Sequence, residues 1–156
     1  MHTGVTKIVN WYLVGSVYPM ESFSEDPPAM IANSPWSGHY YTREVLWGYA
    51  HYGQFSKIGW QYLNGACGKL AAGGTFVTLK SPGKDYSIIL ETKGAKSVQN
   101  VTFNVSGGLY TRKHCVWRSD AKEQFIRQAD IKLVKGSFAI ALEPDAIYSI
   151  STTTGQ

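Results

Sequence analysis

The residue pattern of the chain changes within residues 34–63, SPWSGHYYTREVLWGYAHYGQFSKIGWQYL. This stretch begins with a turn-forming, aromatic-rich loop, SPWSGHYY, and continues as a segment of helical character that ends near Gly59-Trp60. The pattern before it predicts a single strand, and the pattern after it predicts a run of short strands. The stretch is therefore expected to join two architectures.

The middle of the stretch predicts a helix that begins at Thr42, and the family resemblance described below implies that it extends to Ser56. Thr42 is a plausible N-cap, and Glu44 then lies in the first turn, where a carboxylate is stabilised by the helix dipole. Apolar side chains recur at helical spacing along one face. We expect Gly59 to end the helix. The two internal glycines lower its intrinsic stability, so packing against other elements must hold it.

Upstream, Val5–Gly15 (VTKIVNWYLVG) is apolar on both alternating faces. This pattern is typical of a strand that is covered on both sides, as in parallel sheets and barrels. The next residues, 16–35, are rich in proline, serine and acidic residues and predict a loop. The strand therefore has no expected partner here, which suggests that the chain starts inside a domain.

Downstream of Trp60 the sequence predicts short strands separated by the turn sequences SPGKD, KGAK, SGG and EPD. Strand runs at this spacing indicate an antiparallel β-sandwich. Alternation at Phe138, Ile140 and Leu142 predicts one buried face for each sheet. The predicted strands are residues 68–80, 85–92, 97–105, 109–117, 129–136, 137–143 and 146–154.

Composition limits the class of protein. Of the 156 residues, 44% are hydrophobic and 13% aromatic, which is enough for a folded core. The net charge of +4 comes from scattered lysines rather than a basic cluster, which argues against nucleic-acid binding. No apolar run approaches the roughly 20 residues that span a bilayer. The two cysteines, Cys67 and Cys115, could form one disulfide or remain two buried thiols.

The sequence does not supply a complete catalytic constellation. Most of the eleven acidic residues fall in turns, and only Glu91, at the end of an apolar run, is a candidate for a constrained acid rather than a paired strand-end residue. No carboxylate pair has the scaffold that glycosidase chemistry requires. His39, His51 and His114 are not at metal-ligand spacing, so we expect no metal site.

Aromatic residues are more informative than acidic ones. Trp11 lies in the middle of the predicted strand, and the loop that follows the strand carries Trp36, His39, Tyr40 and Tyr41. In barrel enzymes such loops form the active-site face. Flat aromatic rings can stack on the apolar face of a sugar, although the same rings could simply pack the strand against the helix.

Three motifs resemble glycoside hydrolase family 59, the galactosylceramidases: SPWSGHYY, the A-H-x-x-Q-F pattern of residues 50–55, and GWQYL. The similarity extends upstream to IVNWYLVGSVYP and downstream to GGTFVTLKSP, DYSIILET, VWRS and IYSISTTTGQ, and so covers nearly the whole chain. PWSGHY followed by A-H-x-x-Q-F and GW at this spacing is highly specific.

Family members have a TIM (β/α)8 barrel followed by a β-sandwich, which a segment preceding the barrel completes. The resemblance implies a mainly β chain in two parts. Residues 1–58 would hold the last strand, the active-site loop and the last helix of the barrel. Residues 59–156 would form the sandwich.

The family resemblance also implies a retaining β-galactosidase that uses two glutamates on earlier barrel strands. Both would lie outside this chain, which we therefore expect to be inactive alone. Trp11 matches a tryptophan that lines the galactose pocket, and Ser37 and His39 from the loop are assigned with it as substrate-binding residues. We expect no cofactor.

The expected partners are a β-galactoside or galactosylceramide substrate and the missing N-terminal barrel segment of the same polypeptide, with no nucleic acid or metal. The parent enzyme is expected to be secreted or lysosomal, although these residues carry no targeting signal.

The sequence departs from the family pattern in two places. Tyr52 and Gly53 stand where the family has two threonines, and neither Arg112 nor Arg118 matches the sandwich arginine that reaches the sugar in the animal enzyme. An alternative of another class is a non-enzymatic, carbohydrate-binding β-sandwich.

Overall fold

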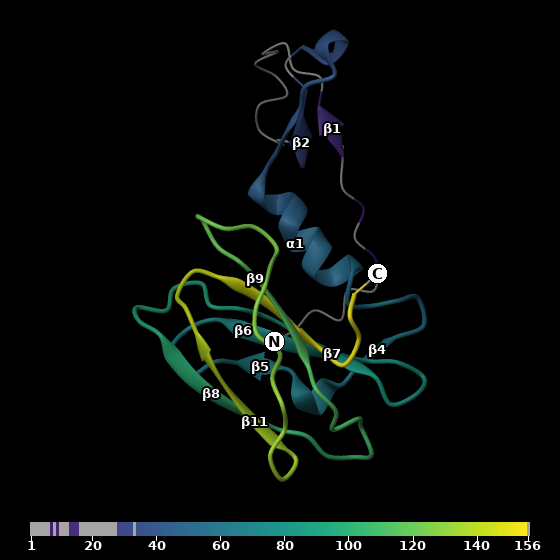
Figure 1. Cartoon of the computed structure of the whole chain (residues 1–156), viewed down its shortest axis with the longest axis vertical. Coiled ribbons are helices and arrows are strands. Elements are labelled where there is room, and N and C mark those ends of the chain that lie inside the picture. Colours follow the sequence, from purple (N-terminus) through teal and green to yellow (C-terminus); the bar gives the residue numbers. More distant parts are fainter. Residues whose placement is uncertain (1–6, 8, 10–12, 16–27, 33, 156) are drawn as a thin grey trace. The chain divides into compact units, whose positions relative to one another are not determined.

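A computed structural model describes residues 7, 9, 13–15, 28–32 and 34–155 of the chain (Figure 1). The chain divides into two compact units. One comprises Gly4–Tyr49, and the other comprises Ala50–Gln156 together with Met1–Thr3. Strands predominate over helices, as predicted for a mainly β chain.

The Gly4–Tyr49 unit contains a small three-stranded sheet in the order β1-β2-β3. β1 (Val14–Gly15) pairs in parallel with β2 (Met30–Ile31), which pairs antiparallel with β3 (Tyr41–Thr42). The expectation that the first strand has no partner is therefore wrong. The short apolar run around Met30, inside the predicted loop, forms backbone hydrogen bonds to it: the Met30 amide donates to the Leu13 carbonyl at 2.9 Å.

The predicted helix is present but shorter than expected. α1 spans Glu44–Gly53, because Thr42 is paired with Met30 in the sheet and cannot serve as its N-cap. The helix ends at Gly53, a residue of low helix propensity, and the Ser56 hydroxyl then donates to the Tyr52 carbonyl at 2.7 Å. Gly59, expected to stop the helix, instead occupies a later turn with φ 92°.

The larger unit is built on a seven-stranded antiparallel sheet in the order β10-β9-β12-β7-β6-β4, with β5 also paired to β6. A short 3-10 helix, η3 (Asn64–Ala66), lies between β4 and β5. The strands are β4 (Gln61–Tyr62), β5 (Gly68–Lys69), β6 (Thr75–Lys80), β7 (Tyr86–Glu91), β9 (Cys115–Ser119), β10 (Ile126–Arg127) and β12 (Ile147–Ser151).

Within the described part of the chain, a second sheet contains two antiparallel strands, β8 (Gln99–Asn104) and β11 (Ser137–Leu142). Its inward side chains pack on the larger sheet through a core that includes Phe138, Leu142, Ile88 and Leu90. Phe103 stacks on Phe138 with ring centroids 5.3 Å apart. The two sheets form the antiparallel sandwich that the strand pattern predicts.

The expectation of one buried face for each sheet is wrong for the larger sheet. Every residue from Tyr86 to Leu90 is buried, so β7 is covered on both faces. On the face away from β8 and β11, Phe55 packs with Leu79 and Ile89 in a second cluster. The segment that follows the helix thus covers a surface that was predicted to face solvent.

One predicted strand is largely absent. Residues 129–136 make only isolated bridges, Ile131 with His114 and Val134 with Ser137. Lys135 and Gly136 both have positive φ, which turns the chain tightly into β11. The short strand β10 was not predicted, because two residues give no detectable alternation.

Candidate functional site

The aromatic loop of the smaller unit is held in a defined turn by its own residues. Pro35 begins a short 3-10 helix, η2 (Pro35–Ser37), and Gly38 ends it in the left-handed conformation, with φ 72°. The Ser37 hydroxyl donates to the Ser34 carbonyl at 2.7 Å and accepts from the His39 amide at 3.1 Å. Ser37 therefore fixes the backbone from which the His39 ring projects.

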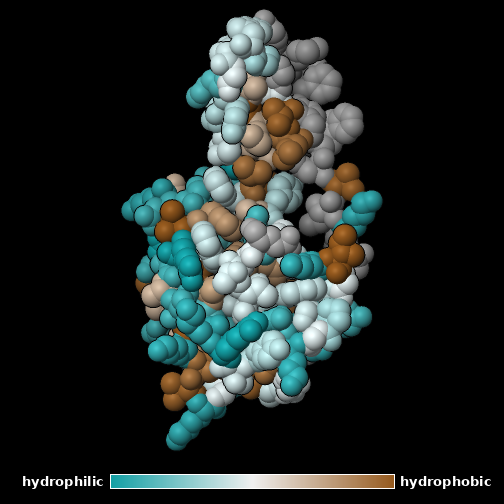
Figure 2. Space-filling model, turned by 45° about the vertical axis from the view of Figure 1, so that its right-hand side comes forward, coloured by the Kyte–Doolittle hydropathy of each residue, from teal (hydrophilic) through white to brown (hydrophobic). Residues whose placement is uncertain are grey.

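The loop presents aromatic rings at its surface. Trp36 is 73% exposed, Tyr40 55% and Tyr41 46%, and His39 is exposed beside them. Hydrophobic side chains also lie at the surface of this unit in Figure 2. The structure places the predicted residues Ser37 and His39 in the same turn, whereas Trp11 lies outside the described residues. The loop thus offers flat apolar faces and one imidazole on a defined backbone.

His51, from the A-H-x-x-Q-F motif, is completely buried in the larger unit. Its Nδ1 lies 2.7 Å from the Ser149 hydroxyl, and its Nε2 lies 2.9 Å from the Ser119 hydroxyl. Ser149 also donates to the His51 carbonyl, and Ser119 also accepts from the Phe125 amide. These bonds assign the ring proton to Nδ1 and leave Nε2 as the acceptor.

Burial lowers the pKa of His51 from 6.5 to about 4, so the ring is neutral at pH 7. Phe55, the last residue of the motif, is buried beside Trp117 and Phe125. The motif therefore anchors the end of the helix to the sheet through one satisfied imidazole and one aromatic ring. Its departures from the family pattern fit this packing, because Tyr52 joins the cluster and Gly53 ends the helix.

A second buried histidine, His114, bonds through Nε2 to the Tyr86 hydroxyl at 2.5 Å. Burial lowers the pKa of His114 to about 4 and raises the pKa of Tyr86. Both residues belong to the sandwich interior, next to Phe138. His51 and His114 are both completely buried.

Replacing Tyr86 with phenylalanine should lower the free energy of unfolding by about 1–3 kcal/mol, because the buried His114 nitrogen loses its partner. Urea denaturation at pH 7 measures this loss. Tyr110→Phe is the matched control, since Tyr110 is exposed and its ring can still lie under Arg112. Equal stabilities of the two variants would show that the hydroxyl contributes nothing.

Most acidic side chains of the larger unit take part in local hydrogen bonds or ion pairs. Glu91 accepts from the Thr75 hydroxyl through one oxygen and from the Lys93 amide through the other, both at 2.7 Å. Glu91 thus has a strand-end role and is not a constrained acid. The ion pairs among the described residues are Asp85–Arg112, Asp130 with Lys113 and Arg127, and Arg118 with Asp120 and Glu123.

Cys67 and Cys115 are both free thiols. No cluster of three histidine, cysteine or acidic residues suited to a metal occurs among residues 34–155 and the other described positions. In the same part of the chain, no helix is both long and apolar enough to cross a bilayer.

Comparison with known proteins identifies the family of the chain. Residues 1–54 match the family described as Glycosyl hydrolase family 59, and residues 62–156 match the Glycosyl hydrolase family 59 central domain. Galactocerebrosidase of Salmo salar is 31% identical over 95% of this chain, and galactocerebrosidase of Homo sapiens is 31% identical over 97%. The chain spans about a quarter of the length of these curated relatives, 25% in each case.

A solved structure supports the fold alone. The GH30 endoxylanase from Clostridium papyrosolvens C71 superposes with a TM-score of 0.63 at 14% identity, over 70% of this chain and 28% of the xylanase. Since its identity is so low, this likeness carries no information about substrate. The two family matches together span both units, so the chain belongs to glycosyl hydrolase family 59.

Proposed function

We propose that the chain is part of a retaining β-galactosidase that hydrolyses the galactosyl bond of galactosylceramide or a related β-galactoside. The family matches in both segments carry this proposal, and the relatives named galactocerebrosidase supply the substrate class. Family resemblance further suggests that the parent enzyme is secreted or lysosomal.

Residues 1–58 would contribute the last strand, loop and helix of the catalytic barrel, and residues 59–156 the supporting sandwich. The ordered aromatic loop supports this division of roles. Its backbone is fixed by Pro35, Ser37 and Gly38, which makes it a rigid platform for a sugar face. Trp11, Ser37 and His39 would bind and orient the galactosyl group.

Hydrolysis would proceed by double displacement, in which one glutamate forms a glycosyl-enzyme intermediate and the other acts as acid and then base. Both glutamates would lie on parts of the barrel outside this chain. Its own residues would hold the sugar and exclude water rather than transfer protons, so the isolated chain should show no turnover.

An assay of the isolated chain with a chromogenic β-galactoside tests this division of labour. We expect no release of the chromophore above background between pH 4 and pH 8. Clear pH-dependent hydrolysis would refute the assignment of the catalytic groups to the missing part. If the longer polypeptide also lacked hydrolytic activity, galactose binding by the isolated chain would favour a carbohydrate-binding sandwich.

Within the longer enzyme, Ser37→Ala should raise the KM for a β-galactoside by about tenfold, because two hydrogen bonds that order the loop are lost. Steady-state kinetics measures this change. Ser81→Ala is the control, since Ser81 also accepts a backbone amide, that of Asp85, but lies in the sandwich. A KM for Ser37→Ala equal to that of the control would contradict a role for the loop in binding.

A further inference from the structure

The link between β4 and β5 contains an asparagine followed directly by a glycine, Asn64-Gly65, in the short helix η3. Asparagine is a thermolabile residue, because the backbone amide nitrogen of the next residue can attack its side-chain amide carbon. A glycine in the next position leaves this approach open, since it has no Cβ. The other asparagines that the structure describes, Asn100 and Asn104, are both followed by valine, whose branched side chain hinders the attack.

Hydrogen bonds hold neither of the two reacting groups. Asn64 and Gly65 are both exposed, and the Asn64 side chain makes no hydrogen bond to any residue that the structure describes. The first amides of a helix have no acceptor within it, and the first bond of η3 joins the Ala66 amide to the Leu63 carbonyl at 2.8 Å. By contrast, the Asn104 side-chain oxygen accepts from the Ser137 hydroxyl at 2.7 Å.

The fold does not require a glycine at position 65. Its φ lies outside the left-handed region, and a Cβ built on it would meet no atom within 4 Å. Gly74, in contrast, has φ 98° and no room for a Cβ. Alanine should therefore fit at position 65, which allows the chemistry of the dipeptide to be separated from its structural role.

We propose that Asn64 is a site of spontaneous deamidation. The Gly65 amide nitrogen forms a bond to Cγ of Asn64 and gives up its proton, while the Cγ–Nδ2 bond breaks and ammonia leaves. Water then opens the resulting five-membered succinimide at either carbonyl and gives aspartate or isoaspartate. Each product carries one more negative charge than asparagine. This reaction does not depend on the proposed glycosidase function, because it rests on the sandwich alone.

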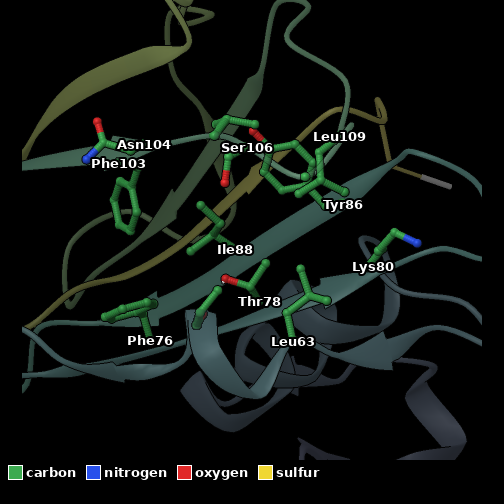
Figure 3. A pocket seen from close by; sticks show the side chains of 13 residues that line it. Leu63, Phe76, Thr78, Lys80, Tyr86, Ile88, Phe103, Asn104, Ser106 and Leu109 are labelled. Atoms are coloured by element: carbon green, nitrogen blue, oxygen red, sulfur yellow. Dashed lines mark hydrogen bonds between the residues drawn. The ribbon is translucent and has the colours of Figure 1, made fainter.

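The two products should differ in their effect, because the segment that reacts is anchored at both ends to Thr78 of β6. The Leu63 amide donates to the Thr78 carbonyl at 2.9 Å (Figure 3), and the Thr78 hydroxyl donates to the Ala66 carbonyl at 2.6 Å. Isoaspartate inserts a methylene group into the backbone between these anchors, whereas aspartate does not. The isoaspartate form should therefore weaken the attachment of η3 and of the neighbouring β4 to β6.

Incubation of the full chain at about pH 8, followed by trypsin digestion and mass spectrometry, tests the site. The tryptic peptide 58–69 contains Asn64 as its one asparagine, and the peptide 97–112 contains Asn100 and Asn104. We expect the first peptide to gain about 1 Da with time and the second to keep its mass. The rate should rise with pH, because the attacking nitrogen must lose its proton. No gain in peptide 58–69, or an equal gain in peptide 97–112, would overturn the proposal.

A variant tests whether Gly65 permits the attack. Gly65→Ala should slow the gain in mass by at least about tenfold, and circular dichroism should show the wild-type fold. Gly83→Ala is the matched control, since Gly83 also lacks a left-handed φ and an added Cβ would make only ordinary contact with the Ser81 hydroxyl at 3.5 Å. Equal rates in the two variants would overturn the assignment of Gly65 as the attacking residue.

The effect of the extra methylene is tested with Asn64→Asp, which carries the charge of the product on a normal backbone. Its urea midpoint should equal that of freshly prepared wild-type protein. Protein that has been incubated until peptide 58–69 contains isoaspartate should have a lower midpoint. Equal midpoints for the incubated protein and Asn64→Asp would overturn the proposed effect on η3.

Discussion

Gly74→Ala is expected to destabilise the sandwich by more than about 4 kcal/mol and to leave little folded protein at 25 °C. A Cβ built at Gly74 would lie 2.1 Å from the Glu91 carbonyl oxygen and 2.8 Å from the Thr92 Cα. Both atoms belong to the backbone, so neither can move without disturbing the pairing of β6 with β7. The residue also has φ 98°, a conformation that side chains rarely adopt.

Far-ultraviolet circular dichroism and urea denaturation of the full chain measure this effect. Gly94→Ala is the matched control, because Gly94 has φ 81° but a Cβ added there would meet no atom within 4 Å. Gly94→Ala should cost only the backbone strain of a left-handed alanine, about 1 kcal/mol. Similar stabilities for the two variants would show that the close approach at Gly74 relaxes at little cost.

The second large effect is a loss of stability in acid. The folded-state pKa values of His51 and His114 are both lowered by burial from 6.5 to about 4. The unfolded chain therefore takes up these protons first as the pH falls. The stability that the two neutral, buried rings contribute to the folded state is fully present above about pH 6.5 and is lost as the pH falls towards 4. Each histidine should account for a loss of about 3 kcal/mol over this interval.

Urea midpoints measured at about pH 7, 5.5 and 4.5 test this linkage. His51→Gln should reduce the stability at pH 7, since its bonds to Ser119 and Ser149 are disturbed, and should also flatten the dependence on pH by about one proton. His39→Ala, which removes an exposed imidazole, is the control for the loss of a histidine. A pH dependence that is unchanged in His51→Gln would contradict the assignment.

Local patterns in the sequence predicted the strands of the sandwich well. β7 and β12 coincide with apolar runs bounded by turn sequences, and short runs of this kind usually form strands. The helix was also predicted, but its start was not. Thr42 has the chemistry of an N-cap, yet its backbone pairs with Met30, and that pairing depends on residues distant in sequence.

Long-range contacts account for what the sequence could not predict. Burial of Ile89 on the second face of the sheet depends on Phe55, which lies 34 positions earlier (89 minus 55). The role of His51 depends on two serines contributed by different strands, and serine alone gives no such signal.

The candidate sugar-binding loop could be predicted from the sequence more fully than these long-range contacts. Proline and glycine at Pro35 and Gly38 specify a tight turn, and the turn forms where they stand. The Ser37 hydroxyl stabilises that turn through hydrogen bonds to residues only two and three positions away. The part of the prediction that rests on Trp11 lies outside the described residues and stays a prediction.

The unequal size of the two sheets has a consequence for motion. β7 has a hydrogen-bonded neighbour on each side and side chains covered on both faces, whereas β8 and β11 pair only with each other among the residues that the structure describes. We therefore expect the amide protons of β8 and β11 to exchange with deuterium when these two strands open locally, whereas the amide protons of β7 exchange only when the whole sandwich unfolds. The same local opening of β8 and β11 would let molecules from solvent enter the interior of the sandwich.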